Sequence, residues 1–243
     1  MQRKRVIIHA VLPKTGTTSI QHMLSDAVDA LAEQDTAAIV RDERTAKLRA
    51  TGLKLRPDLG LKQQRKYYRA AREFWNHVKT LQATNVIVSD ENILGINSGN
   101  MFRPGTDRCA RIAMRLIAFS KPIRFDLTVV LYTRDPEKLH LSAWNQIRKR
   151  SVVPDYREWA SENPDIHLAN SIALGLRTGF RRKVVTFEME HELSKGRFLG
   201  QGLYELANLS AIPAPLKEYK ENVSANYQYQ GPSQQLSGRV WRA

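Results

Sequence analysis

The feature that most constrains the fold is a strand with the composition of a buried strand, followed directly by a glycine-containing turn and a helix. Residues 6–12 (VIIHAVL) are almost all apolar and largely β-branched, which is typical of a central parallel strand covered on both faces. The turn at 13–19 follows, and apolar residues then recur at helical spacing, which predicts a helix over about 18–33. A strand, a tight turn and a helix in this order predict an α/β fold.

The turn itself carries residue types that suit an anion. Backbone amides at a helix N-terminus are unpaired and lie at the positive end of the helix dipole, so they bind phosphate. Gly16 allows close approach of the backbone and Lys14 adds a positive charge, while neighbouring hydroxyls add donors. The pattern lacks the second glycine of a Walker A loop, and an ordinary capped helix is the alternative. The candidate nucleotide-binding residues here are Lys14, Thr15, Gly16, Thr17, Thr18 and Ser19.

Strands and helices alternate along the rest of the chain. Further strands are predicted at 85–89, 125–132 and 183–187, and helices at about 62–83, 108–120, 136–149, 155–161, 167–176 and 198–209. This alternation predicts a three-layer sandwich with a central, mainly parallel sheet. Residues 41–61 are polar and punctuated by glycine and proline, so we expect an irregular insertion. We expect one domain over 1–225 and a polar, partly disordered tail over 226–243.

The charge balance favours anionic partners. Lys and Arg number 38 against 24 Asp and Glu, which gives a net charge of +14. Such a charge attracts nucleotides, acidic glycans, anionic lipid and nucleic acid, or it simply solvates the surface. The single cysteine, Cys109, excludes an intramolecular disulfide, and the six histidines show no metal-ligand spacing, so we expect no metal. No apolar run reaches the roughly 20 residues of a membrane span, and we expect a cytoplasmic protein.

A second group of residues gives the turn a more specific meaning. Arg134 follows the predicted strand at 125–132, Pro136 opens the next helix, and Ser142 lies about two helical turns along it. The sequence Pro-Lys-x-Gly-Thr-Thr after the first strand, together with Arg-x-Pro-x-x-x-x-x-Ser, resembles sulfotransferases that use 3′-phosphoadenosine-5′-phosphosulfate (PAPS). The similarity, to bacterial members in particular, spans roughly residues 5–210. It implies the P-loop NTPase-like sulfotransferase fold, with the turn at the 5′-phosphosulfate and Arg134 and Ser142 at the 3′-phosphate.

The resemblance also implies a reaction. The enzyme would transfer the sulfuryl group of PAPS in line to a hydroxyl or amine and release 3′,5′-adenosine bisphosphate (PAP), with no metal required. Lys14 suits the leaving oxygen, because its ammonium can follow the developing charge. Family members use a His or Glu beyond the strand between the two phosphate motifs as the base. Here Glu91 is the candidate, with Asp90 as the alternative and His9, His22 and His140 as weaker ones.

Other readings of the sequence stay open. A P-loop nucleotide phosphotransferase would explain only the first turn, and a non-catalytic binder of nucleic acid or another polyanion would explain only the charge. No alternation of aromatic and basic residues marks a nucleic-acid surface, so we do not expect that partner. The expected acceptor is a carbohydrate, a glycolipid or another small molecule, and basic loops suit an anionic one. The Arg-Lys-Gly that closes over the nucleotide in cytosolic relatives is absent, so that contact stays unassigned.

Overall fold

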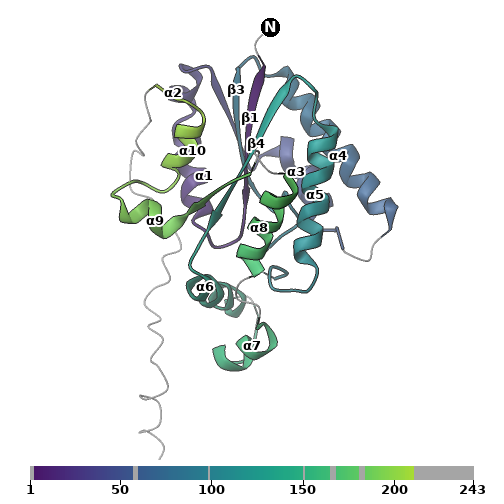
Figure 1. Cartoon of the computed structure of the whole chain (residues 1–243), viewed down its shortest axis with the longest axis vertical. Coiled ribbons are helices and arrows are strands. Elements are labelled where there is room, and N and C mark those ends of the chain that lie inside the picture. Colours follow the sequence, from purple (N-terminus) through teal and green to yellow (C-terminus); the bar gives the residue numbers. More distant parts are fainter. Residues whose placement is uncertain are drawn as a thin grey trace, which may run out of the picture.

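One parallel sheet forms the centre of the protein (Figure 1). The computed structural model describes residues 3–56, 60–97, 99–149, 151–164, 168–180 and 184–210. The strands within these ranges are β1 (Lys4–Val11), β2 (Thr36–Val40), β3 (Asn85–Glu91), β4 (Phe125–Thr133) and β5 (Val184–Glu188). They lie in the order β2-β3-β1-β4-β5, and each neighbouring pair is parallel. The predicted α/β architecture with a central parallel sheet is confirmed.

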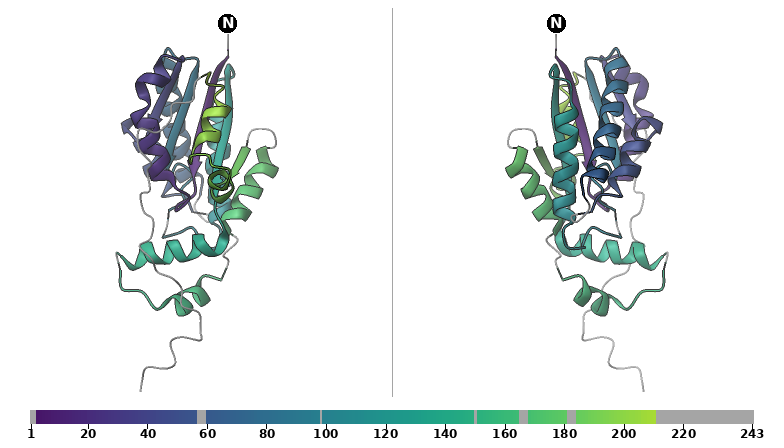
Figure 2. Two further views of the ribbon diagram at one scale, coloured as in Figure 1. Left: turned by 90° about the vertical axis from the view of Figure 1, so that its left-hand side faces the viewer. Right: turned by 90° about the vertical axis from the view of Figure 1, so that its right-hand side faces the viewer.

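Helices cover both faces of the sheet and one of its ends. Helices α1, α2 and α10 lie on one face, and α4, α5 and α8 lie on the other (Figure 1). Helices α6 and α7 lie beyond the carboxyl ends of the strands, and α6 runs across that end (Figure 2). The described helices are α1 (Thr17–Asp26), α2 (Val28–Ala32), α3 (Glu43–Gly52), α4 (Leu61–Thr80), α5 (Thr106–Ser120), α6 (Pro136–Arg148), α7 (Tyr156–Glu162), α8 (Leu168–Phe180), α9 (Met189–Ser194) and α10 (Gln201–Leu206).

The continuous apolar character of β1 follows from its central place. Because side chains alternate along a strand, Val6 and Ile8 enter the core beneath α4 and α5, whereas Ile7 enters the core beneath α1 and α10. All three side chains are almost completely buried. A strand buried on both faces needs apolar residues at nearly every position. The direction of β1 then fixes where the turn after it emerges.

The structure differs from the sequence-based expectation on the β2 side of the sheet. The stretch expected to be irregular at 41–61 contains α3, and Asp42 caps this helix by accepting a hydrogen bond from the backbone amide of Arg44 at 2.8 Å. The expectation of irregular structure is therefore wrong for Glu43–Gly52. Helix α3 is polar along most of its length, which left it without a clear apolar stripe. Strand β2 was not predicted either, and it is a short strand at the edge of the sheet.

Other expectations concern element ends and the tail. The helix expected over 18–33 is two helices, because the chain breaks its helical geometry at Ala27 between α1 and α2. The predicted tail at 226–243, and the domain boundary at 225, lie outside the described residues. Among the described helices, none combines the length and apolarity that crossing a lipid bilayer requires.

Candidate functional site

The connections of neighbouring strands diverge beside β1, at the position that corresponds to the ligand-binding crevice of open parallel sheets. The chain leaves β1 toward β2 on one side of the sheet, whereas it leaves β4 toward β5 on the other. The carboxyl ends of β1 and β4 therefore border the position where open parallel sheets bind ligands. The turn containing Lys14 follows β1, and Arg134 follows β4. The Nη1 group of Arg134 donates to the carbonyl oxygen of Lys14 at 3.2 Å, so the two sequence elements meet directly.

The backbone of the turn adopts an uncommon conformation. Lys14 has φ +69° and Gly16 has φ +77°, and a left-handed conformation is unusual for a lysine. The hydroxyl of Thr15 donates to the carbonyl oxygen of Leu12 at 2.7 Å, which holds the inside of the turn. A Cβ atom on Gly16 would lie 2.1 Å from Cδ2 of Leu199. Both the backbone conformation and the side chain packed over it therefore favour glycine at this position.

The start of α1 presents donors without a side-chain cap. Gly16 is the N-cap residue and has no side chain that could cap the first amides of α1. Thr17 is the first residue of the helix and is 4% exposed. Its hydroxyl has no hydrogen-bond partner within the described part of the chain, which is unfavourable for a buried polar group. Thr18 is half-buried and Ser19 is buried beside it. Hydroxyl and amide donors of this kind at a helix N-terminus are the groups that an anion-binding site requires.

Helix α6 brings a second set of side chains to the turn. The ammonium of Lys14 lies 3.4 Å from Oε1 of Gln146 and donates a hydrogen bond to it. Ser142 stands four positions earlier on α6, which places it on the same face of the helix. Ser142 is buried. The face of α6 that carries the predicted 3′-phosphate residue therefore meets the turn that carries the predicted 5′-phosphosulfate residues.

A carboxylate that the sequence interpretation did not include lies beside Arg134. Oε1 of Glu190 is 3.5 Å from the Nε atom of Arg134, and Oε2 accepts a hydrogen bond from the backbone amide of Asp135 at 3.2 Å. Glu190 lies on α9, directly after β5, at the same edge of the sheet as the crevice. An acidic residue two positions past a strand end was the available sequence signal. Gln146 left no comparable signal, because a single glutamine on a helix is common.

The two candidate bases occupy different surroundings. The backbone of Glu91 lies beside that of Val11 in the register of β3 and β1, and its side chain is 25% exposed. Its Oε2 atom is 3.9 Å from Nη1 of Arg41. Asp90 is fully buried, and both Thr45 and Arg49 donate hydrogen bonds to its carboxylate.

These surroundings separate a structural carboxylate from an accessible one. Burial raises the pKa of Asp90 to about 6, and the hydrogen bonds from Thr45 and the charge of Arg49 oppose that rise. Asp90 thus fastens α3 to β3, since both of its partners belong to that helix. Glu91 is the carboxylate that a ligand in the crevice could reach.

Two of the three candidate histidines have structural partners. His9 is fully buried, its Nδ1 atom lies 2.9 Å from the hydroxyl of Ser89, and burial lowers its pKa to about 3. His140 uses both ring nitrogens, one with the hydroxyl of Tyr156 at 3.0 Å and the other with the carbonyl oxygen of Asn163 at 2.9 Å. His140 therefore joins α6 to the end of α7. His22 is exposed on α1.

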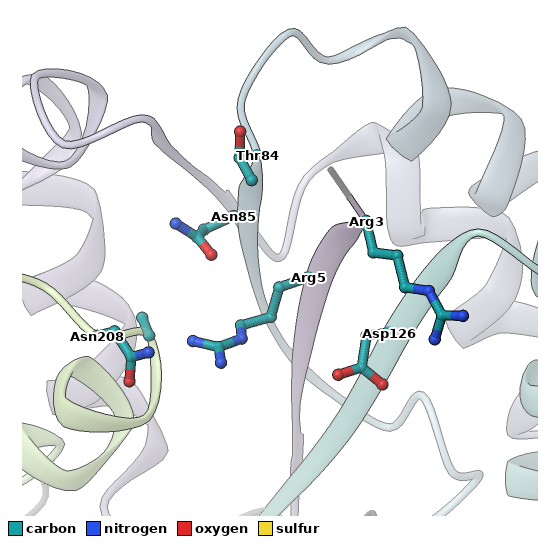
Figure 3. A pocket seen from close by; sticks show the side chains of 7 residues that line it. Arg3, Arg5, Thr84, Asn85, Asp126 and Asn208 are labelled. Carbon is teal, nitrogen blue, oxygen red and sulfur yellow. The ribbon is translucent and has the colours of Figure 1, made fainter. Parts of the chain in front are cut away.

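A separate cavity lies at the opposite edge of the sheet. It has a volume of about 420 Å³ and is bordered by side chains at the amino ends of the strands, among them Arg3, Arg5 and Asp126 (Figure 3). Both charges are present, and Arg5 donates to the carbonyl oxygen of Leu206. This cavity is distinct from the crevice. In the described ranges, no three His, Cys, Asp or Glu side chains are grouped in a way that could hold a metal ion.

Comparisons with known proteins give distant likenesses. No protein-family model and no curated protein matches the chain. Among solved structures, a sulfotransferase from Alicyclobacillus acidocaldarius is similar, with 14% identity and a TM-score of 0.49 over 91% of this chain and 87% of that one. A deoxyadenosine kinase from M. mycoides is similar with 12% identity and a TM-score of 0.40 over 84% of this chain and 100% of that one. Likenesses at this level assign neither a family nor an activity.

Proposed function

We propose that this protein is a sulfotransferase that uses PAPS as donor and a hydroxyl or amine as acceptor. The observation that carries the proposal is the hydrogen bond from Arg134 to the carbonyl oxygen of Lys14. It joins two sequence elements that lie 120 residues apart and that resemble the two phosphate-binding elements of one nucleotide. A ligand with phosphate groups at two ends would contact both elements in this crevice.

The described residues fit such a ligand in several respects. The uncapped amides at the start of α1 and the unpartnered hydroxyl of Thr17 suit the 5′ end, and Thr15, Gly16, Thr18 and Ser19 complete the turn. Arg134 offers a planar, permanently charged donor group to the 3′-phosphate, and we propose Ser142 as its partner. We propose no metal in this site.

The reaction is a displacement at sulfur. The acceptor oxygen or nitrogen bonds to sulfur while the bond between sulfur and the bridging oxygen breaks, and PAP leaves. Lys14 stabilises the negative charge that develops on the bridging oxygen, which requires its ammonium to leave Gln146. Glu91 accepts the proton of the acceptor. The position of Glu91 beside the end of β1 supports this role, whereas the buried contacts of Asp90 do not.

The net charge of the protein supports a proposal for the class of acceptor. A net charge of +14 suits an acceptor that carries negative charge, and we propose an anionic glycan or glycolipid at a bacterial surface or its cytoplasmic precursor. A screen of candidate acceptors with labelled sulfate donor would identify it. The same screen would show whether the enzyme transfers to oxygen or to nitrogen.

Ligand binding tests the donor directly. Isothermal titration with PAP, AMP, and ATP plus magnesium should show the tightest binding for PAP. Arg134→Ala should weaken PAP by roughly 10- to 100-fold, the usual effect of losing a charge-assisted hydrogen bond, and should leave AMP within about threefold. Arg72→Ala, on the exposed face of α4, is the matched control. Tightest binding of ATP, or equal losses for PAP and AMP, would refute the proposed donor.

A further inference from the structure

We infer that Glu190 is a positioning residue that fixes the guanidinium of Arg134 for phosphate binding. The inference rests on the proposed function, because it concerns the group that would bind the 3′-phosphate. Glu190 itself does not contact the nucleotide in this scheme. Its role is to decide which edge of Arg134 remains open to the ligand.

The contacts of Arg134 divide its donors among three directions. Nη1 donates to the carbonyl oxygen of Lys14 at 3.2 Å, whereas Nε faces Oε1 of Glu190 at 3.5 Å in an ion pair without a hydrogen bond. Within the described residues, Nη2 has no hydrogen bond. A guanidinium that is oriented by one hydrogen bond and one ion pair keeps the Nη2 donors for an anion.

Glu190 can hold Arg134 because it is anchored itself. Its second carboxylate oxygen accepts a hydrogen bond from the backbone amide of Asp135, the residue next to Arg134. One carboxylate therefore fixes both the side chain of Arg134 and the backbone that follows it. The side chains of Arg134 and Glu190 are 24% and 33% exposed, so their contact is partly shielded from water.

The helix that carries Glu190 is fastened to the next helix. Glu192, also on α9, is buried and accepts hydrogen bonds from the amides of Gly200 at 2.9 Å and Gly202 at 2.7 Å. These amides lie at the start of α10, which packs on the same face of the sheet as α1. Glu190 therefore projects from a braced element, and its carboxylate has a defined place relative to the crevice.

The energetic argument concerns side-chain freedom. An unrestrained arginine loses rotamer freedom when it binds a phosphate, and an arginine that is already fixed loses less. The negative charge of Glu190 repels a nearby phosphate and opposes this gain in affinity. A glutamine at 190 would remove the repulsion but keep only one acceptor oxygen, so its amide group could retain the contact with Arg134 or the one with the Asp135 amide but not both, whereas an alanine would remove both.

The test is a double-mutant cycle with two ligands. We expect Glu190→Ala to weaken PAP about tenfold and to leave AMP unchanged, and Glu190→Gln, which can keep one of the two contacts, to weaken PAP less than Glu190→Ala does. In an Arg134→Ala background, Glu190→Ala should change PAP affinity less than about twofold, because its effect passes through Arg134. Glu188→Ala, exposed two positions earlier, is the control, and thermal unfolding checks that each variant is folded.

Each outcome points to one conclusion. If Glu190→Ala weakens PAP equally with and without Arg134, Glu190 acts on the fold or directly on the ligand, and the positioning role is wrong. If Glu190→Ala binds PAP as tightly as the wild type does, Glu190 does not position Arg134 and the role is again wrong. If the wild-type protein does not prefer PAP to AMP, the proposed function fails first and the inference fails with it.

Discussion

The packing of Leu199 over Gly16 predicts how a substitution in the turn at residues 13–19 changes the stability of the protein. Gly16→Ala places a Cβ atom 2.1 Å from Cδ2 of Leu199, in a residue whose φ is +77°. Gly196 offers a matched control, because its φ is +68° and a Cβ there would have no neighbour within 4 Å. The two substitutions share the conformational penalty, and only one of them adds a steric conflict.

The expected magnitudes follow from these two terms. A left-handed conformation costs an alanine roughly 1–2 kcal/mol, so Gly196→Ala should lower the free energy of unfolding by about that amount. Overpacking adds roughly 1–3 kcal/mol, so Gly16→Ala should lose about 2–5 kcal/mol. The far end of the Leu199 side chain can move, which favours the lower half of that range. Leu199→Ala should remove most of the conflict, giving a coupling of roughly 1 kcal/mol or more.

Urea unfolding followed by circular dichroism measures the free energy of unfolding of Gly16→Ala, Gly196→Ala, Leu199→Ala and the Gly16→Ala/Leu199→Ala double variant. If Gly16→Ala and Gly196→Ala lose the same free energy of unfolding, the Leu199 side chain moves aside without an energetic penalty. Additive losses for Gly16→Ala and Leu199→Ala would refute the packing argument altogether. PAP binding by Gly16→Ala adds a second readout, since an altered turn should also weaken the ligand.

Three further predictions concern the carboxylates of β3 and the lysine of the turn. The pKa of Asp90 rises from 3.8 to about 6 on folding, so the folded state keeps its proton longer and stability should fall as pH rises from about 4 to 6. Asp90→Asn should lack this loss of stability, which amounts to at most about 3 kcal/mol. If the free energy of unfolding in urea depends on pH in the same way for both proteins, the prediction is wrong. Lys14→Ala should lower turnover about 100-fold or more, while PAP affinity changes much less; Lys138→Ala, exposed on α6, is the control, and retained turnover would place the leaving-group role elsewhere. Glu91→Gln should lower turnover about 100-fold with the acceptor identified by screening, and activity near that of the wild type would exclude Glu91 as the base.

The sequence predicted most of the fold correctly where strands are covered on both faces of the sheet. The apolar run of β1 and the β-branched stretches of β3 and β4 leave little choice of structure, because each is covered on both faces. Strand β2 and helix α3 were missed for the opposite reason. Both lie at one edge of the sheet, and α3 is held by a polar contact through Asp90 instead of an apolar stripe. Such contacts depend on residues more than 40 positions apart, which local periodicity does not reveal.

The candidate site was predictable as two pieces but not as a network. Residue types and spacing located Lys14 and Arg134, and the parallel sheet brings both to one edge. The contacts of Gln146 with Lys14 and of Glu190 with Arg134 were not predicted, because they depend on the orientation of α6 and α9 relative to the strand ends. The choice between Asp90 and Glu91 also needed burial. In sequence the two carboxylates are adjacent, and their different burial in the structure separates Asp90 from the candidate Glu91.

The packing of Leu199 over Gly16 also bears on how the protein is made. The turn at residues 13–19 leaves the ribosome among the first twenty residues, whereas Leu199, which packs over it, follows about 180 residues later. Arg134 reaches the same turn at an intermediate stage. In a nascent chain shorter than about 200 residues, the proposed nucleotide site is thus unfinished. Affinity for the nucleotide should therefore emerge late in synthesis and serve as a reporter of completed folding.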